Sequence, residues 1–129
     1  MKQFVKGWAV TAVAAMTISW PAHAYFDHFL NQTIVGTLGK AGTDELVSTF
    51  GRVMSESEDG TTVPIKLPPN NAGKVTEGTI TPLKTRTEAG QRCRQVQTEF
   101  RQEGRKSERW KGWYCQQPDL SWKKTMLKD

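Results

Sequence analysis

The chain has 129 residues and a formal net charge of +5 at pH 7. This length suits one small domain with a core that is modest for its surface. The mild positive charge is not by itself typical of a nucleic-acid-binding protein.

Residues 1–24 have the pattern of a secretory signal peptide. Lys2 and Lys6 supply a basic start, Trp8 to Trp20 form a largely apolar run, and Ala22-His23-Ala24 is a small-x-small ending. We expect cleavage between Ala24 and Tyr25. The alternative, an uncleaved membrane anchor, needs nearer twenty apolar residues. Because this leader holds two lysines and no acid, the charge of +5 becomes +3 for residues 25–129.

Residues 25–59 are expected to form a helical arm. Thr43 is a candidate helix cap, and Asp44 and Glu45 suit the positive end of the helix dipole. The five apolar residues that follow share one helix face. This face predicts either ordinary core packing or a docking helix that enters a neighbour's groove. The candidate docking residues are Leu46, Val47, Phe50, Val53 and Met54.

Residues 60–74 are expected to be a linker. The run GTTVPIKLPPNNAGK contains three prolines and an Asn-Asn cluster followed by glycine. Such a composition excludes a helix and favours an extended connection. We therefore expect a boundary here.

Residues 75–129 are expected to form a small antiparallel sheet. The candidate strands are residues 77–82, 91–100, 107–116 and 120–126, separated by short turns. Pro82 suggests an edge or a strand end. The sequence thus predicts an α+β protein: an N-terminal helical segment, a Pro-rich linker, and a disulfide-stapled sheet of three to four strands.

The two cysteines, Cys93 and Cys115, are expected to form a disulfide. Export would place them where disulfides persist. A metal site with His28 or a redox pair without C-x-x-C spacing is less favoured. If strands 91–100 and 107–116 pair about a turn near residue 104, the cysteines lie almost opposite each other, and the bond stabilises the fold by roughly 3 to 4 kcal/mol. A direct cross-strand bond is demanding, so a bulge or a shifted register is an alternative.

The same pairing assigns side chains to the two faces of the sheet. Val96, Phe100, Trp110 and Tyr114 fall on one face and are the expected core, which leaves Trp113 exposed. Positive residues cluster around it, as either a solvated hairpin face or an anion-binding patch. The candidate binding surface comprises Arg94, Arg105, Lys106, Arg109, Lys111 and Trp113.

Residues 77–122 resemble the C-terminal domain of the seventeen-kilodalton rickettsial surface antigen family. The matching positions are Gly78, Ile80-Thr81-Pro82, Thr85, Gly90, Cys93-Arg94, Gln97, Gly104, Gly112, Cys115, Pro118-Asp119 and Trp122. The resemblance implies an envelope-associated surface or periplasmic protein without an established catalytic activity. Family members commonly begin with a lipidated cysteine, whereas this chain has none near the expected cleavage site, which argues against a lipid anchor in the outer membrane. We expect a peripheral rather than a transmembrane protein.

Catalytic chemistry is not expected. His28, beside Asp27, is the only histidine after the leader, and no phosphate-binding loop, cofactor site or metal cluster stands out. We expect a non-enzymatic structural or scaffolding component of a periplasmic or outer-membrane assembly that docks through its helical arm, with no specific nucleic acid as partner. The alternative is a secreted or periplasmic binder or inhibitor of an anionic cell-envelope polymer or acidic protein, acting through the basic hairpin.

Overall fold

The computed structural model describes residues 33–128, so the expected leader and residues 25–32, including His28, lie outside the described residues. The described part contains a short 3-10 turn, one α-helix and five strands. In chain order these are η2 (Val35–Thr37), α3 (Gly39–Glu56), β1 (Val63–Lys66), β2 (Thr76–Glu88), β3 (Gln91–Gln102), β4 (Glu108–Gln116) and β5 (Trp122–Thr125). The predicted α+β architecture, with a helical segment before an antiparallel sheet, is confirmed.

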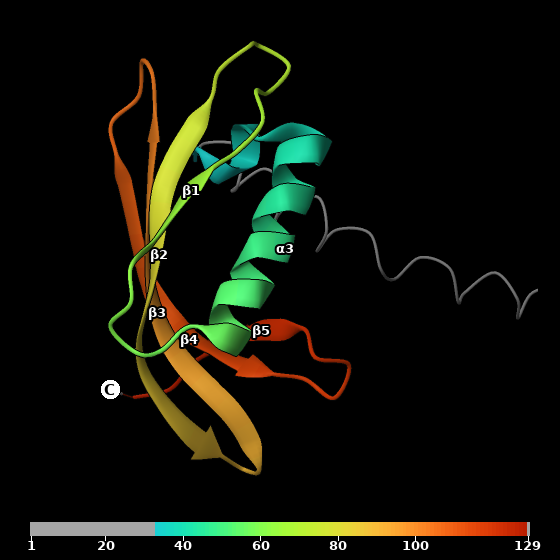
Figure 1. The fold of residues 1–129 in the computed structure, drawn as a ribbon, viewed down its shortest axis with the longest axis vertical. Coiled ribbons are helices and arrows are strands. Elements are labelled where there is room, and N and C mark those ends of the chain that lie inside the picture. The colour runs from blue at the N-terminus through green and yellow to red at the C-terminus, as the bar shows by residue number, and fades with distance from the viewer. Residues whose placement is uncertain (1–32, 129) are drawn as a thin grey trace, which may run out of the picture.

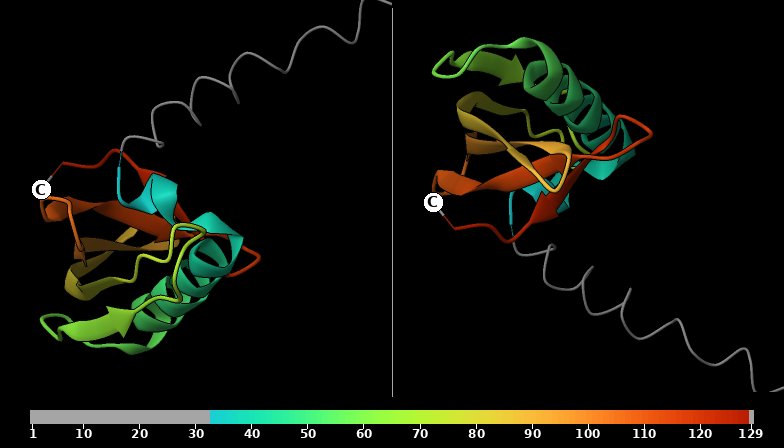
Figure 2. Two further views of the ribbon diagram at one scale, coloured as in Figure 1. Left: turned by 90° about the horizontal axis from the view of Figure 1, so that it is seen from above. Right: turned by 90° about the horizontal axis from the view of Figure 1, so that it is seen from below.

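The five strands form one sheet in the order β1-β2-β3-β4-β5, and each strand is antiparallel to the next. Every strand therefore pairs with its sequence neighbour, as short turns dictate. At the β2–β3 turn Ala89 and Gly90 both have positive φ, 51° and 82°, the backbone that a two-residue hairpin loop needs. The helix α3 lies against one face of the sheet (Figures 1 and 2).

The main core lies between α3 and the sheet. Val53 and Met54 on α3, and Ile34 and Leu38 just before it, are buried against apolar side chains of the strands. Each such burial contributes roughly 1.5 to 3 kcal/mol. The strand-side members of this core are Ile65, Leu67, Ile80, Val96 and Phe100.

The helix starts earlier than the sequence predicts. It begins at Gly39, so Thr43 is an interior residue and not the cap. The buried Leu38 takes the capping position without a side-chain hydrogen bond. Gly42 lies against it, because a Cβ at that position would approach the Leu38 Cβ to 3.1 Å. Apolar anchoring therefore sets the start of the helix.

The expected number of three to four strands is wrong, because β1 lies within the expected linker. Val63, Ile65 and Leu67 alternate along this segment, and the last two are buried in the core. Pro64 does not prevent pairing because β1 is an edge strand, where a missing N–H can face outward. The register of β1 with β2 is Val63↔Ile80, Pro64↔Thr79, Ile65↔Gly78 and Lys66↔Glu77.

Pro82 lies inside β2, although the sequence suggested that it ends a strand. The register with β3 shifts between Pro82 and Lys84, so Leu83 is the extra residue of a bulge. β1 pairs with β2 only as far as Ile80, so the part of β2 around Pro82 is itself an edge of the sheet. The Gly60 N–H covers it by donating a 2.6 Å hydrogen bond to the Pro82 carbonyl.

Candidate functional site

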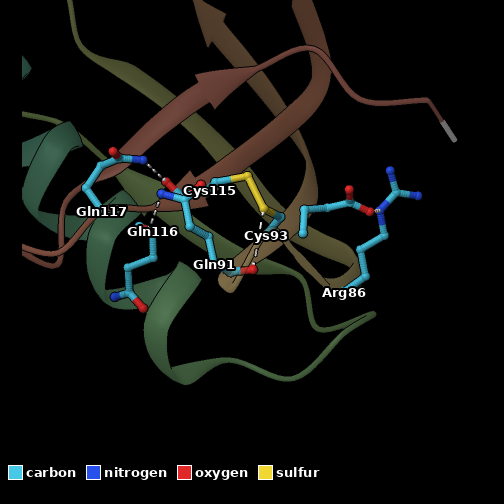
Figure 3. Close-up of a disulfide and its surroundings, with 7 residues drawn as sticks. Arg86, Gln91, Cys93, Cys115, Gln116 and Gln117 are labelled. Carbon is cyan, nitrogen blue, oxygen red and sulfur yellow. Dashed lines mark hydrogen bonds and ion pairs between the residues drawn. A yellow bond between two sulfur atoms is a disulfide. The ribbon is translucent and has the colours of Figure 1, made fainter.

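The disulfide lies on the sheet face opposite α3. Cys93 and Cys115 are register partners on β3 and β4, with Cα atoms 4.0 Å apart, so the predicted bond is present without a bulge between these strands. Two glutamine side chains bond to the backbone beside it: Gln117 donates to the Cys115 carbonyl at 3.0 Å, and Gln91 to the Gln116 carbonyl at 3.4 Å (Figure 3). Both cysteines are buried, so the bond is a structural staple.

Trp113 belongs to this second cluster and does not lie on the surface as predicted. Only 3% of it is exposed, because it packs with Cys93 and Cys115 and is approached by Leu127 of the C-terminal tail. The Arg86 guanidinium lies 4.4 Å from its ring centroid, within cation–π range. The Arg86 Nε is 2.9 Å from a Glu88 carboxylate oxygen but is not oriented to hydrogen-bond to it. Trp113 is therefore a packing residue.

Arg94, another residue of the candidate binding surface, is buried under the end of α3. Its side chain is 1% exposed, and its guanidinium donates to the Met54 carbonyl at 2.6 Å, to the Thr85 hydroxyl at 2.8 Å and to the Asp59 carboxylate at 2.8 Å. The hydrogen bond from Arg94, with that from Thr85, lowers the pKa of Asp59 below its usual value. Arg94 thus holds the carboxyl end of the helix on the sheet and is not accessible to a partner.

Four of the five candidate docking residues of α3 face the chain's own sheet. Val53 and Met54 are in the core, and Leu46 and Phe50 pack against it, Phe50 with its ring centroid 4.9 Å from that of Tyr114. Val47 alone of the five points outward, with 66% of it exposed. The structure thus uses the apolar face for core packing, the other interpretation that the sequence allowed.

The remaining four predicted surface residues are exposed at one end of the sheet. Arg105 and Lys106 lie in the β3–β4 turn, and Arg109 and Lys111 lie on β4. We call these four residues the basic hairpin. The basic hairpin lies at the same end of the sheet as the β1–β2 loop (Figure 1). Lys74 of that loop forms an ion pair of 3.6 Å with Glu103 of the β3–β4 turn.

The acidic residues near the basic hairpin already have partners. Glu99 contacts both Arg101, at 3.4 Å, and Arg109, at 3.2 Å. The Glu108 carboxylate accepts a 2.9 Å hydrogen bond from the Ile34 N–H. Lys106 and Lys111 have no acidic partner among residues 33–128, so their charges are uncompensated.

Trp110 is the exposed aromatic residue that the sequence reasoning missed. Parity correctly placed it on the α3 side of the sheet with Tyr114, but 44% of it is exposed. The core under α3 reaches Tyr114 and Trp122 and does not extend to Trp110. Its neighbours Arg109 and Lys111 project from the opposite side of the same strand. The exposed ring and the two cations therefore lie on opposite faces of the same stretch of β4.

A small open hollow lies beside the disulfide. Its lining is mainly polar, from Gln91, Cys115, Gln117, Lys123, Lys124 and Thr125. Residues 33–128 contain no group of three His, Cys, Asp or Glu side chains placed to hold a metal ion. Within the same range, no helix combines the length and apolarity needed to cross a membrane.

Comparison with known proteins gave no match. No protein-family model matches the chain, and no curated protein or solved structure is significantly similar to it. The fold and the contacts described above therefore carry the functional conclusions.

Proposed function

We propose that this chain is a non-enzymatic protein of the bacterial cell envelope that binds an anionic partner through its basic hairpin. The observation that carries the proposal is the uncompensated charge of Lys106 and Lys111, on a surface where Glu99, Glu103 and Glu108 already have partners within the chain. A partner with closely spaced carboxylate or phosphate groups would gain electrostatic energy there without displacing existing ion pairs.

The proposed location in the envelope rests on three features. The sequence begins with a leader pattern, the Cys93–Cys115 bond is compatible with export to an oxidising compartment, and residues 77–122 resemble a family of bacterial surface antigens. Together they favour a peripheral protein of the periplasm or the outer membrane.

We place the partner on the basic hairpin and not on the helical arm. Docking through α3 would require Phe50, Val53 and Met54 to leave the sheet, which would expose the main core to water. The basic hairpin needs no such rearrangement, because its side chains are already exposed.

The test is binding of the full chain to two anionic probes, polyglutamate and lipopolysaccharide, with polylysine as the negative probe. The variant Lys106→Glu/Lys111→Glu should bind at least one anionic probe about tenfold more weakly than the parent at low salt. The matched control Lys66→Glu/Lys128→Glu changes the net charge equally but lies outside the basic hairpin, and it should lose much less.

Binding should also weaken as salt is added, since exposed charges are screened. Equal losses in the two double variants would show that net charge alone drives the binding. If the parent chain binds neither polyglutamate nor lipopolysaccharide, the proposed function is contradicted.

A further inference from the structure

β4 is longer than the strand that pairs with it on its outer side. β5 pairs with Trp113–Gln116, and within residues 33–128 no strand pairs with Glu108–Gly112 on that side. We call the outer side of Glu108–Gly112 the open edge. We infer that the open edge accepts an extended acidic segment of a partner protein as an added β-strand, and this inference rests on the proposed function.

The geometry of the disulfide shows which backbone groups the open edge presents. A Cα–Cα distance of 4.0 Å is typical of register partners that do not exchange hydrogen bonds, so Cys115 directs its N–H and C=O away from β3. This orientation alternates along the strand. Trp113 directs the same groups to β5, whereas Lys111 and Arg109 direct theirs to the open edge.

Side chains along the open edge favour a partner strand with alternating character. Arg109 and Lys111 project on the face opposite α3, and Trp110 projects between them on the α3 face. An added strand would place acidic residues beside Lys111, whose charge is uncompensated, and beside Arg109, which also contacts Glu99. It would place apolar residues beside the exposed Trp110 ring. Main-chain hydrogen bonds would supply affinity, and this alternation would supply specificity.

The charges of the open edge disfavour a second copy of this chain as the occupant. Antiparallel pairing of two identical edges about a two-fold axis must centre on one residue, because register partners share a face. Centred on Trp110, it places Arg109 opposite Lys111; centred on Arg109 or Lys111, it places that residue opposite itself. Each register sets like charges against each other, which is destabilising. An acidic strand has the opposite effect.

The probe for this proposal is a short capped peptide in which glutamate alternates with valine. Its first control has the same length and alternates lysine with valine. The second and third controls keep the acidic sequence and carry N-methyl groups on alternate amides. In the second control these amides point to one edge of the peptide strand, and in the third control they point to the other edge. N-methylation keeps the charges and removes the donors that a strand needs.

Amide hydrogen exchange of the full chain, followed by NMR, reports on the open edge directly. The acidic peptide should slow exchange at Arg109 and Lys111 by at least about tenfold, the effect of one well-formed hydrogen bond. Trp110 is the internal control: its N–H points to β3, so its exchange should change little.

Substitutions at Lys111 separate charge from hydrogen bonding. Lys111→Ala removes the charge, and Lys111→Pro removes both the charge and an N–H that does not bond to β3. We expect the proline variant to bind the acidic peptide about tenfold more weakly than the alanine variant. If the proline variant fails to fold, the N-methylated peptides make the same distinction on the parent chain.

Several outcomes would overturn the inference. If both N-methylated peptides bind as well as the unmethylated acidic peptide, charge alone holds the partner. That result would support the proposed function and contradict strand addition. Protection of Arg109 and Lys111 before peptide is added would show that residues of the chain itself occupy the edge. Protection that grows with protein concentration would identify a second copy. If no anionic probe binds, both proposals fail.

Discussion

Replacing Arg94 with methionine should lower the free energy of unfolding by about 3 kcal/mol. The Arg94 guanidinium lies between β3 and the carboxyl end of α3, where it makes three hydrogen bonds. Methionine is flexible enough to fill much of the same space but has no donor. The substitution therefore tests the hydrogen bonds more than the packing.

The three hydrogen bonds differ in value because their acceptors differ in exposure. The Met54 carbonyl is buried, and losing a charged donor there costs about 1.5 to 3 kcal/mol. The Asp59 side chain is 45% exposed, so water replaces the guanidinium and the loss is about 0.5 to 1 kcal/mol. Thr85 is exposed and contributes least, which gives a total of about 3 kcal/mol.

Urea unfolding under non-reducing conditions, followed by circular dichroism, measures this loss, and the melting temperature should fall by about 15 °C. The matched control is Arg92→Met, two residues before Arg94 on the same strand. Arg92 is exposed, 3.3 Å from the Ser55 carbonyl and 5.8 Å from the Trp122 ring centroid. Its replacement should cost less than about 1 kcal/mol.

Two results would contradict the role assigned to the Arg94 guanidinium. If Arg94→Met stays within about 1 kcal/mol of the parent, the buried guanidinium does not hold the helix on the sheet. If Arg92→Met costs as much as Arg94→Met, the loss reflects charge on this strand in general and not the buried contacts.

Three further predictions concern other contacts. Gly78→Ala should destabilise the fold by more than about 2 kcal/mol in urea unfolding, because a Cβ there overlaps the Glu99 carbonyl; a smaller loss would mean that β2 and β3 can separate. Arg94 holds the pKa of Asp59 below its usual 3.8, so the unfolding free energy should fall as pH drops below about 4, and Asp59→Asn should reduce that fall; an unchanged pH profile would contradict this. Joint replacement of Cys93 and Cys115 by alanine should lower the free energy of unfolding in urea by about 3 kcal/mol. Reductant should lower the stability of the parent but not that of the double variant, and equal stability of the two proteins without reductant would contradict this.

Contacts near in sequence were predictable from the sequence. The strands β3 and β4 flank a short turn, so the turn centre sets the register and brings Cys93 opposite Cys115. Alternation then assigned Val96 and Tyr114 correctly to the core side of the sheet. β1 was missed because Pro64 and its neighbouring prolines outweighed the alternation of Val63, Ile65 and Leu67, although an edge strand tolerates proline.

The candidate site was only partly predictable, since exposure depends on elements that cover each face. Trp113 is covered by Arg86 and the C-terminal tail, whereas Trp110 lies beyond the core under α3. The sequence placed these two residues on opposite faces but assigned burial to the wrong one. No local pattern reports how far a helix extends over a sheet.

The helix-then-sheet order, the disulfide and the location of the basic hairpin were predictable from the amino-acid sequence, because they depend on composition, alternation and turn position. Three features became visible only in the folded chain: Arg94 is buried, the apolar face of α3 packs on its own sheet, and half of β4 has an open edge. Each of these depends on contacts between residues far apart in the chain. A charged side chain becomes a core residue where a helix end and a carboxylate meet it, and a strand has an edge only where its neighbour ends.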